Sequence, residues 1–272
     1  MADLRPVESA STHAFVRSLG VPKLPPRTSA FDPGYDPQTL ISHLEQSGYL
    51  LSRLKLSMST WLIADEQATA AKISAAHRLG VPLVTGGGPF EIARARGRLE
   101  AFIELCAAFG IERIEAGEGF TEPRPPEDTM KLAERYGLEV QVELGEKQGG
   151  TFDDATAQRL RERGRRWLDA GAAQVVIEGR ESAQGIGLFD PTGRLNTALA
   201  EKFVDAWGLE ATVFEAPTKP SQFAFLTHFG NRVNLSNVRL EEILRVEIYR
   251  RGLHADSFAR ELATRPASEA PA

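Results

Sequence analysis

The sequence predicts a single (β/α)8 barrel, and three observations lead to that prediction. The chain has 272 residues, a length that suits one large α/β domain. Eight short apolar segments alternate with longer amphipathic segments. Five of the amphipathic segments end at a glycine that is followed by an expected strand. A doubly wound open sheet is the alternative, and the lack of a G-x-G-x-x-G motif after any expected strand weakens it.

The expected strands are short and rich in apolar and β-branched residues, as strands covered on both faces should be. They cover residues 28–32, 52–57, 82–86, 112–117, 139–145, 174–179, 211–217 and 232–237. The helices that end at a glycine are expected over residues 37–48, 66–80, 98–110, 128–137 and 157–171. At each of these stops the glycine is expected to supply the left-handed conformation that closes a helix.

The domain organisation follows from these elements. Residues 28–260 form the predicted barrel, residues 1–27 an N-terminal arm, and residues 261–272 a flexible C-terminal tail. The segment SNVRLEE, residues 236–242, is expected to begin a capped helix after the eighth strand. The three glycines at 86–88 are interpreted as a flexible turn, with close backbone approach to a ligand as the alternative.

Composition limits the class of protein. The net charge is −5, so there is no basic excess of the kind that binds nucleic acid. The single cysteine, Cys106, excludes an intrachain disulfide, and the scattered histidines do not show zinc-ligand spacing. No apolar stretch approaches the roughly 20 residues of a membrane span, and the first residues lack a signal-peptide core. We therefore expect a cytoplasmic protein that binds neither nucleic acid nor a membrane, and the N-terminal arm is a candidate contact between the subunits of a homo-oligomer.

Charged side chains fall at the ends of most expected strands, where barrels carry their active sites. Any single one can be a barrel-mouth salt bridge, but the whole set favours a polar cavity. The carboxylates suit a hard cation such as Mg²⁺, and the cations and amides suit phosphate or carboxylate groups. Asn234 and Asn237 both lie on the eighth expected strand.

Six segments resemble motifs of the phosphosulfolactate synthases, an enzyme family of coenzyme M biosynthesis. Together they fall within residues 28–260, in order and at fitting spacing. The segments are GVPLVTGGGPFEIA (80–93), VELGEK (142–147), VIEGRESAQGIGLFDPTG (176–193), FEAPTKPSQFAF (214–225), RVNLSNV (232–238) and YRRGLHADSF (249–258). The resemblance implies a (β/α)8 barrel and a Mg²⁺-dependent lyase that adds sulfite to C3 of phosphoenolpyruvate, giving 2-phospho-3-sulfolactate.

The resemblance also implies roles for individual residues. Negative charge would build on the substrate carboxylate, a metal ion would stabilise it, and an acid would protonate C2. Lys147, the lysine of the E-x-G-x-K motif, is the expected acid. The candidates for holding Mg²⁺ or orienting Lys147 are Glu115, Glu143, Glu178 and Glu215. The candidates for binding substrate are Lys55, Arg180, Lys219, Gln222 and Asn234.

The chain departs from the family pattern at three expected strand ends. Pro33 stands where a basic residue is usual, Ser57 lies in a stretch that is usually glycine-bearing, and Ala116 replaces a β-branched residue in a segment that also loses a serine. Two alternatives therefore stay open. One is an enzyme of the same scaffold with a different nucleophile or enol substrate, and the other is a non-catalytic, stress-associated family member.

Overall fold

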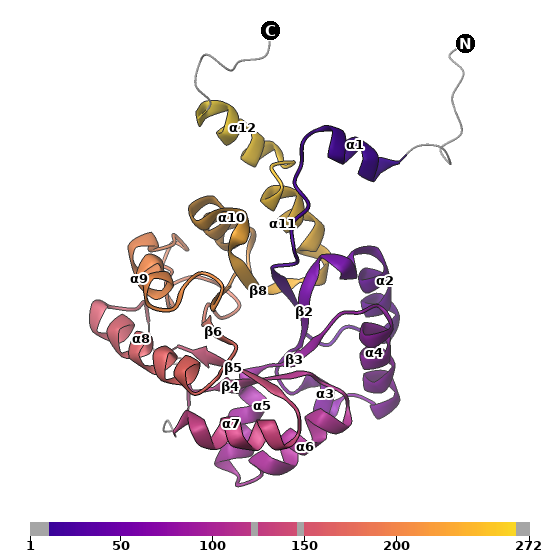
Figure 1. Ribbon diagram of the computed structural model, residues 1–272, viewed down its shortest axis with the longest axis vertical. Coiled ribbons are helices and arrows are strands. Elements are labelled where there is room, and N and C mark those ends of the chain that lie inside the picture. The colour runs from indigo at the N-terminus through magenta and orange to yellow at the C-terminus, as the bar shows by residue number, and fades with distance from the viewer. Residues whose placement is uncertain (1–10, 121–124, 146–149, 265–272) are drawn as a thin grey trace.

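The computed structural model describes residues 11–120, 125–145 and 150–264. A ring of strands lies at the centre, and helices surround it (Figure 1). The terminal helices α1 and α12 project beyond the ring on the same side, near α11 (Figure 1). The architecture confirms the predicted single-domain (β/α)8 barrel.

The barrel is closed by eight parallel strands that pair in sequence order, with β1 also paired to β8. The predicted strand positions are confirmed, with ends that differ by a few residues. The strands are β1 (Thr28–Asp32), β2 (Leu51–Leu56), β3 (Leu83–Thr85), β4 (Arg113–Gly117), β5 (Glu139–Leu144), β6 (Gln174–Ile177), β7 (Thr212–Glu215) and β8 (Asn234–Arg239).

Helices follow the strands and cover the outside of the barrel (Figure 1). They are α1 (Thr12–Ser18), α2 (Pro37–Ser47), α3 (Thr60–Ile63), α4 (Glu66–Arg78), α5 (Gly87–Ala95), α6 (Leu99–Ala108), α7 (Pro126–Arg135), α8 (Asp154–Asp169), α9 (Thr197–Trp207), α10 (Lys219–Phe229), α11 (Ile243–Arg250) and α12 (Ala255–Thr264). Short 3-10 helices cover Gly48–Leu50, Gly230–Arg232 and Leu240–Glu242. Among the described residues, no helix is both long and apolar enough to cross a membrane.

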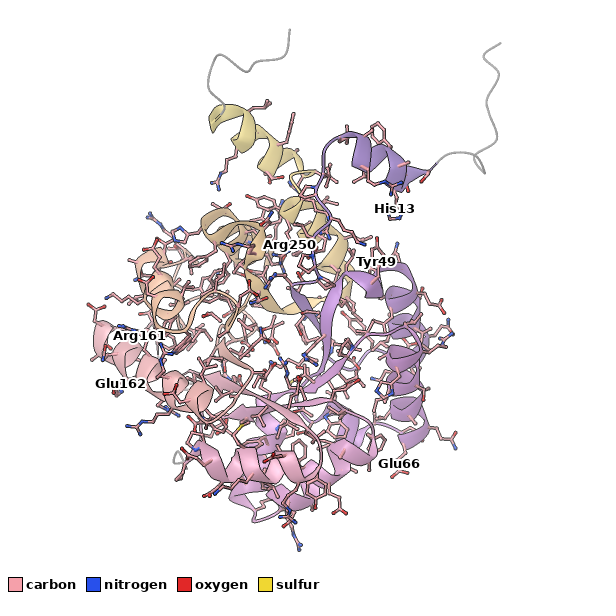
Figure 2. All side chains as sticks on the ribbon, viewed as in Figure 1. His13, Tyr49, Glu66, Arg161, Glu162 and Arg250 are labelled. Atoms are coloured by element: carbon pink, nitrogen blue, oxygen red, sulfur yellow. The ribbon has the colours of Figure 1, made fainter. Side chains whose placement is uncertain are left out.

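The arm and the tail both carry helices. The arm contains α1, none of whose residues is buried, and the His13 ring lies 6.5 Å from the Tyr49 ring on the barrel (Figure 2). At the other end, α12 runs across the expected boundary between residues 260 and 261. Charged side chains such as Glu66 and Glu162 lie exposed on the outer helices (Figure 2).

Four of the five glycine stops have the expected left-handed backbone. Gly80, Gly110, Gly137 and Gly171 have φ angles of 67°, 74°, 70° and 106°. The expectation is wrong at Gly48, whose φ of −56° continues the right-handed path. A Cβ at Gly48 would lie 3.0 Å from Cγ2 of Val81, so glycine serves close packing there rather than a left-handed turn.

The expected helix start at 236–242 is also wrong. Strand β8 continues to Arg239, and α11 begins only at Ile243. The segment pairs on both sides: Ser236 lies opposite Glu215 of β7, and Val238 lies opposite Ala30 of β1. Closing the barrel requires these pairs, so the strand outweighs the local capping signal.

Candidate active site

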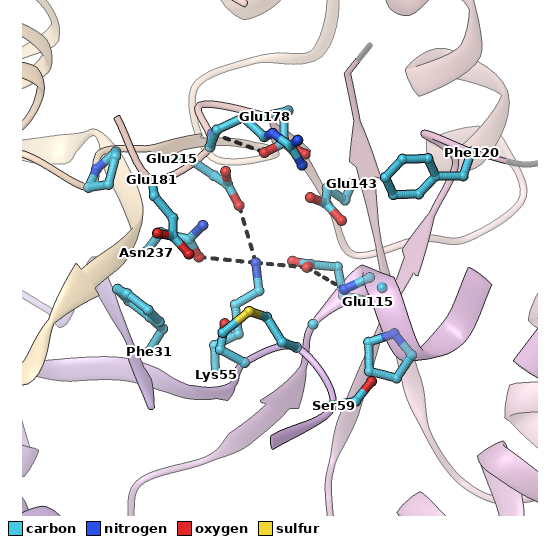
Figure 3. Close-up of a pocket in the computed structure, with 18 of the residues that line it drawn as sticks. Phe31, Lys55, Ser59, Glu115, Phe120, Glu143, Glu178, Glu181, Glu215 and Asn237 are labelled. Atoms are coloured by element: carbon cyan, nitrogen blue, oxygen red, sulfur yellow. Dashed lines mark hydrogen bonds and ion pairs between the residues drawn. The ribbon is translucent and has the colours of Figure 1, made fainter. Parts of the chain in front are cut away.

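A cavity of about 600 Å³ opens at the carboxyl ends of the strands (Figure 3). Its lining combines acidic and basic groups with apolar side chains such as Phe31 and Phe120. Five buried charged residues form its polar floor: Lys55, Glu115, Glu143, Glu178 and Glu215. All five were predicted as site residues, and the barrel brings them together.

Strand alternation explains this convergence. Side chains on a strand point to opposite faces in turn, so one residue near each strand end faces the barrel interior. Lys55 takes this position on β2, Glu115 on β4, Glu143 on β5 and Glu215 on β7. Glu178 follows directly after β6, whose last residue is Ile177.

Lys55 lies at the centre of the polar floor. Its Nζ lies 2.7 Å from Oε1 of Glu115 and 3.2 Å from Oε1 of Glu215, and it donates to Oδ1 of Asn237 at 3.1 Å (Figure 3). Burial alone would lower the pKa of this amine, but the nearby carboxylates outweigh burial and raise the pKa. Lys55 therefore stays cationic and can attract anions.

Glu115 is held by three donors. One oxygen receives the Gly87 backbone N–H at 2.9 Å as well as the Lys55 amine, and the other receives Nε2 of Gln141 at 2.8 Å. Burial, with added repulsion from Glu143 and Glu215, raises the pKa of the Glu115 carboxyl, while Lys55 opposes the shift. These contacts tie Glu115 to Lys55.

Glu143, Glu178 and Glu215 form a second group, which we call the carboxylate trio. One oxygen from each lies within 4.8 Å of the others, and all three side chains are buried. Backbone N–H groups orient two of them: Arg180 donates to Glu178 at 2.9 Å, and Gly179 donates to Glu215 at 3.0 Å. Three converging carboxylates are a ligand set for a hard divalent cation, so the trio fits Mg²⁺.

Close glycine contacts shape the space around the trio. A Cβ at Gly87 would lie 2.1 Å from Oε2 of Glu143, and a Cβ at Gly145 would lie 2.3 Å from Cβ of Glu178. Gly87 is the first residue of α5, so the interpretation of residues 86–88 as a flexible turn is wrong. The glycines instead let the start of α5 approach the polar floor.

Cations and unusual backbone conformations lie around the cavity. Arg180 lines the cavity as predicted, and its side chain is exposed. Arg239 also lines the cavity, and its guanidinium lies 5.6 Å from the Phe31 ring centroid.

Three residues that line the cavity have a left-handed backbone: Met58, Arg180 and Asn237 have φ angles of 52°, 55° and 55°. Left-handed non-glycine residues cost about 1 kcal/mol or more each and concentrate at functional sites. Their position supports this cavity as the active site.

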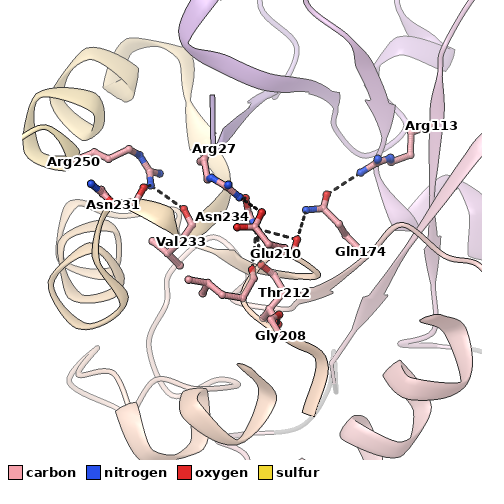
Figure 4. Close-up of polar contacts among 11 residues, drawn as sticks. Arg27, Arg113, Gln174, Gly208, Glu210, Thr212, Asn231, Val233, Asn234 and Arg250 are labelled. Carbon is pink, nitrogen blue, oxygen red and sulfur yellow. Dashed lines mark hydrogen bonds and ion pairs between the residues drawn. The ribbon is translucent and has the colours of Figure 1, made fainter. Parts of the chain in front are cut away.

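The structure does not bring Asn234 into this cavity. Asn234 begins β8, so it lies at the opposite end of the barrel, where Nδ2 donates to the carbonyls of Leu209, Glu210 and Thr212 at 3.0, 3.2 and 3.1 Å (Figure 4). Asn237 stands at the cavity end of the same strand. The expected strand at 232–237 could have indicated this, because Asn237 is its last residue and lies about 10 Å further along the strand than Asn234.

Lys219 and Gln222 also lie outside the lining of the cavity. Lys219 is exposed at the start of α10, 5.1 Å from the Phe223 ring centroid and 3.8 Å from Asp256. Gln222 is buried on the same helix, where its Nε2 donates to the Ala216 carbonyl at 3.1 Å and to Glu242 at 2.8 Å. Lys147 lies in residues 146–149, outside the described part of the chain.

Several lining residues were not predicted as site residues. Ser57, Met58 and Ser59 follow β2, and Glu181 and Ser182 follow the Arg180 position. Loop residues carry no periodic signal, so only the strand end before them could have indicated their position.

Asp32, at the end of β1, does not line the cavity although it is a charged residue at a strand end. Its carboxylate accepts hydrogen bonds from Lys72 at 2.5 Å and from the N–H groups of Gly34 and Tyr35 at 2.8 and 2.7 Å.

A (β/α)8 barrel with buried carboxylates and a lysine at the carboxyl ends of its strands has the architecture of a barrel enzyme. The model of the (2R)-phospho-3-sulfolactate synthase (ComA) family matches residues 21–256. The chain belongs to this enzyme family.

Curated relatives agree with the family match. A phosphosulfolactate synthase of Methanocaldococcus jannaschii is 32% identical over 235 residues, covering 86% of this chain and 94% of the relative. A phosphosulfolactate synthase of Bacillus subtilis is 26% identical over 230 residues, covering 84% of this chain and 90% of the relative.

Solved structures share the fold. The 3-dehydroquinate dehydratase of Geobacillus kaustophilus superposes with a TM-score of 0.53 at 12% identity, covering 90% of this chain and 95% of that one. The carboxyl transferase domain of Rhizobium etli pyruvate carboxylase gives a TM-score of 0.57 at 12% identity, covering 87% and 46%. At this identity the likeness concerns the barrel alone.

Proposed function

We propose that this chain is a Mg²⁺-dependent phosphosulfolactate synthase, which adds sulfite to C3 of phosphoenolpyruvate. The observation that carries the proposal is the carboxylate trio beside Lys55, at the carboxyl ends of the strands of a barrel from this family. Acidic and cationic groups are both needed, because the reaction joins two anions and builds further negative charge.

The proposed reaction is an addition in which no group leaves. The sulfur lone pair of sulfite forms the C–S bond at C3, and the C2–C3 π electrons move onto C2 and the attached carboxylate. A proton delivered to C2 completes 2-phospho-3-sulfolactate. Lys147 is the proposed proton donor, in keeping with the family motif that contains it.

The remaining residues bind and orient. The trio would hold Mg²⁺, which when bound supplies Lewis-acid stabilisation of charge on the substrate carboxylate. Lys55 and Arg180 are proposed to neutralise substrate anions, Lys55 from the floor and Arg180 from the rim. Glu115 keeps the Lys55 amine in place through their 2.7 Å ion pair.

A second candidate is an enzyme of the same scaffold with a bulkier enol substrate. The observation that favours it is an apolar part of the cavity lining, where Met58, Ile92 and Phe120 are 48%, 50% and 56% exposed. Of the three departures from the family pattern, Ser57 lines the cavity, whereas Pro33 and Ala116 do not. The change at Ser57 therefore bears most directly on substrate choice.

One assay tests the proposal. The purified protein is incubated with phosphoenolpyruvate, sulfite and Mg²⁺, and 2-phospho-3-sulfolactate is measured by mass spectrometry. We expect product with the wild type, none after chelation of the metal, and none with Glu178→Gln. A folded, metal-loaded wild type that gives no product would contradict the sulfite reaction. A test with enol phosphates that carry an apolar substituent would then examine the second candidate.

A further inference from the structure

We infer that the side-chain amide of Asn237 donates a hydrogen bond to a charged oxygen of the substrate. The identity of that substrate as phosphoenolpyruvate rests on the proposed function, whereas the direction of the hydrogen bond rests on the contacts of Asn237. Asn237 is part of β8, and its side chain lies beside Lys55 in the cavity (Figure 3).

Lys55 fixes which way the amide faces. An ammonium group has donors and no acceptor, so the group that it contacts at 3.1 Å must be the amide oxygen, Oδ1. Lys55 is held in turn by its ion pairs with Glu115 and Glu215, and its side chain is only 5% exposed. The amide NH2 of Asn237 therefore cannot turn toward Lys55 without losing this contact.

The NH2 group has room for a ligand. Within the described residues, no side chain or carbonyl accepts a hydrogen bond from Nδ2 of Asn237, although Oδ1 is engaged. The side chain is only partly buried, and it lines the cavity of about 600 Å³. A substrate atom can therefore supply the missing acceptor.

The backbone makes this arrangement rigid. Asn237 has a φ of 55°, a left-handed conformation that asparagine adopts more readily than most residues. The flanking residues Ser236 and Val238 are paired to β7 and β1. Because both neighbours are fixed, the amide is positioned before a ligand arrives, which reduces the entropy lost on binding.

The electrostatic surroundings select the kind of acceptor. An oxygen that accepts from Nδ2 also lies near the Lys55 ammonium, and Mg²⁺ held by the trio would offset the charge of the neighbouring carboxylates. A negatively charged oxygen is therefore favoured over a neutral one when the metal is bound. The neutral amide adds a donor without adding a charge to a floor that already holds four carboxylates and Lys55. A carboxylate or phosphate oxygen is the acceptor that fits.

Two substitutions separate this role from a structural one. Asn237→Asp keeps the oxygen that faces Lys55 but replaces the donor with a second anionic oxygen. Asn237→Gly removes the amide and tolerates the left-handed backbone, so the fold is expected to persist. Asn196→Asp is the matched control, because Asn196 is exposed at the start of α9 and aspartate caps a helix equally well.

The measurement is calorimetric titration of the full chain with phosphoenolpyruvate in the presence of Mg²⁺, repeated with inorganic phosphate. We expect affinity for at least one anion to fall about tenfold or more in Asn237→Asp and several-fold in Asn237→Gly. Melting temperatures of both variants should stay close to that of the wild type. Asn196→Asp should bind as the wild type does.

Unchanged affinity in Asn237→Gly, or a wild type that binds neither anion, would overturn the inference. Failure of the proposed function looks different: the wild type would bind phosphoenolpyruvate or phosphate, with the affinity still dependent on Asn237, yet no phosphosulfolactate would form with sulfite.

Discussion

Gln141 links the two ends of the barrel interior. Its Oε1 accepts from Arg113 at 3.3 Å, near the amino-terminal ends of the strands, and its Nε2 donates to Glu115 at 2.8 Å, in the active-site floor. Arg113 has only donors, so the amide must present its oxygen to Arg113 and its NH2 to Glu115. Gln141 thereby positions the carboxylate that holds Lys55.

Replacing Gln141 should impair catalysis more than folding. We expect Gln141→Met, which keeps the length but loses both hydrogen bonds, to lower kcat/KM by about tenfold or more, because Glu115 loses a buried donor. Gln174→Met is the control, since Gln174 also accepts from Arg113, at 2.8 Å, but donates to the Glu210 carbonyl instead (Figure 4). Equal kinetic effects of the two changes would argue against the positioning role.

At single residues, the sequence could predict the chemistry better than the location. The strand-end glutamates and Lys55 were predictable because strand alternation determines which way they face. Asn234 was misplaced because the family resemblance, rather than the position along the strand, was used to choose it, and Asn237 lies nearer the carboxyl end of the same strand. Lys219 was misplaced because the chain enters α10 at that residue and turns it outward.

Helix α5 depends on its first glycine to approach the site. We expect Gly87→Ala to reduce metal binding and activity strongly, since its Cβ would lie 2.1 Å from Oε2 of Glu143 and displace that carboxylate. Gly88→Ala is the matched change one residue later, where no atom lies within 4 Å of the new Cβ. The metal affinity of the two variants, measured by titration, should differ by about tenfold or more. Equal affinities would show that the close contact between Gly87 and Glu143 does not affect metal binding.

The loop after β6 lies within residues 176–193, one of the segments that resemble a motif of the family. Gly187 has a φ of 58°, and a Cβ there would lie 2.6 Å from the carbonyl oxygen of Glu178. We expect Gly187→Ala to destabilise the protein by about 1–3 kcal/mol, because both the backbone conformation and the contact are unfavourable. Urea unfolding followed by circular dichroism measures this change. A variant as stable as the wild type would contradict it.

At the scale of elements, strands and helix stops were the most predictable features. Apolar runs and terminal glycines are local signals, and they located all eight strands. The exceptions have a tertiary cause. Gly48 is a glycine because Val81 packs against it, and residues 236–239 belong to β8 rather than to a helix because β1 and β7 pair with them.

The whole barrel depends on closing β8 against β1. We call the pairing of β1 with β8 the seam of the barrel. A buried ion pair lies next to it: Nε of Arg250 lies 3.1 Å from Oε1 of Glu247, and the same oxygen accepts a hydrogen bond from the Thr28 hydroxyl of β1 at 2.6 Å. Arg250 also donates to the carbonyls of Asn231 and Val233, both at 2.8 Å (Figure 4). Helix α11 thus connects the first strand to the last.

Breaking this ion pair should destabilise the entire domain. We expect Arg250→Met to lower the free energy of unfolding by about 3–5 kcal/mol, because the Glu247 carboxylate would remain buried with much of its pairing lost. Thermal and urea denaturation measure the change. Arg135→Met, which removes an exposed ion pair to Glu100, should cost less than about 1 kcal/mol. Similar costs for the two variants would contradict a special role for the seam.

The central claim is that the carboxylate trio binds a divalent cation at the carboxyl ends of the strands. The most direct test titrates the metal-free protein with Mn²⁺, as a substitute for Mg²⁺, and counts bound ions by electron paramagnetic resonance. The wild type should bind one Mn²⁺ per chain at the trio. Glu178→Gln should lose that ion, whereas Glu118→Gln, which alters a buried carboxylate paired to Arg163 instead, should retain it. Tight binding that persists in Glu178→Gln would contradict the claim.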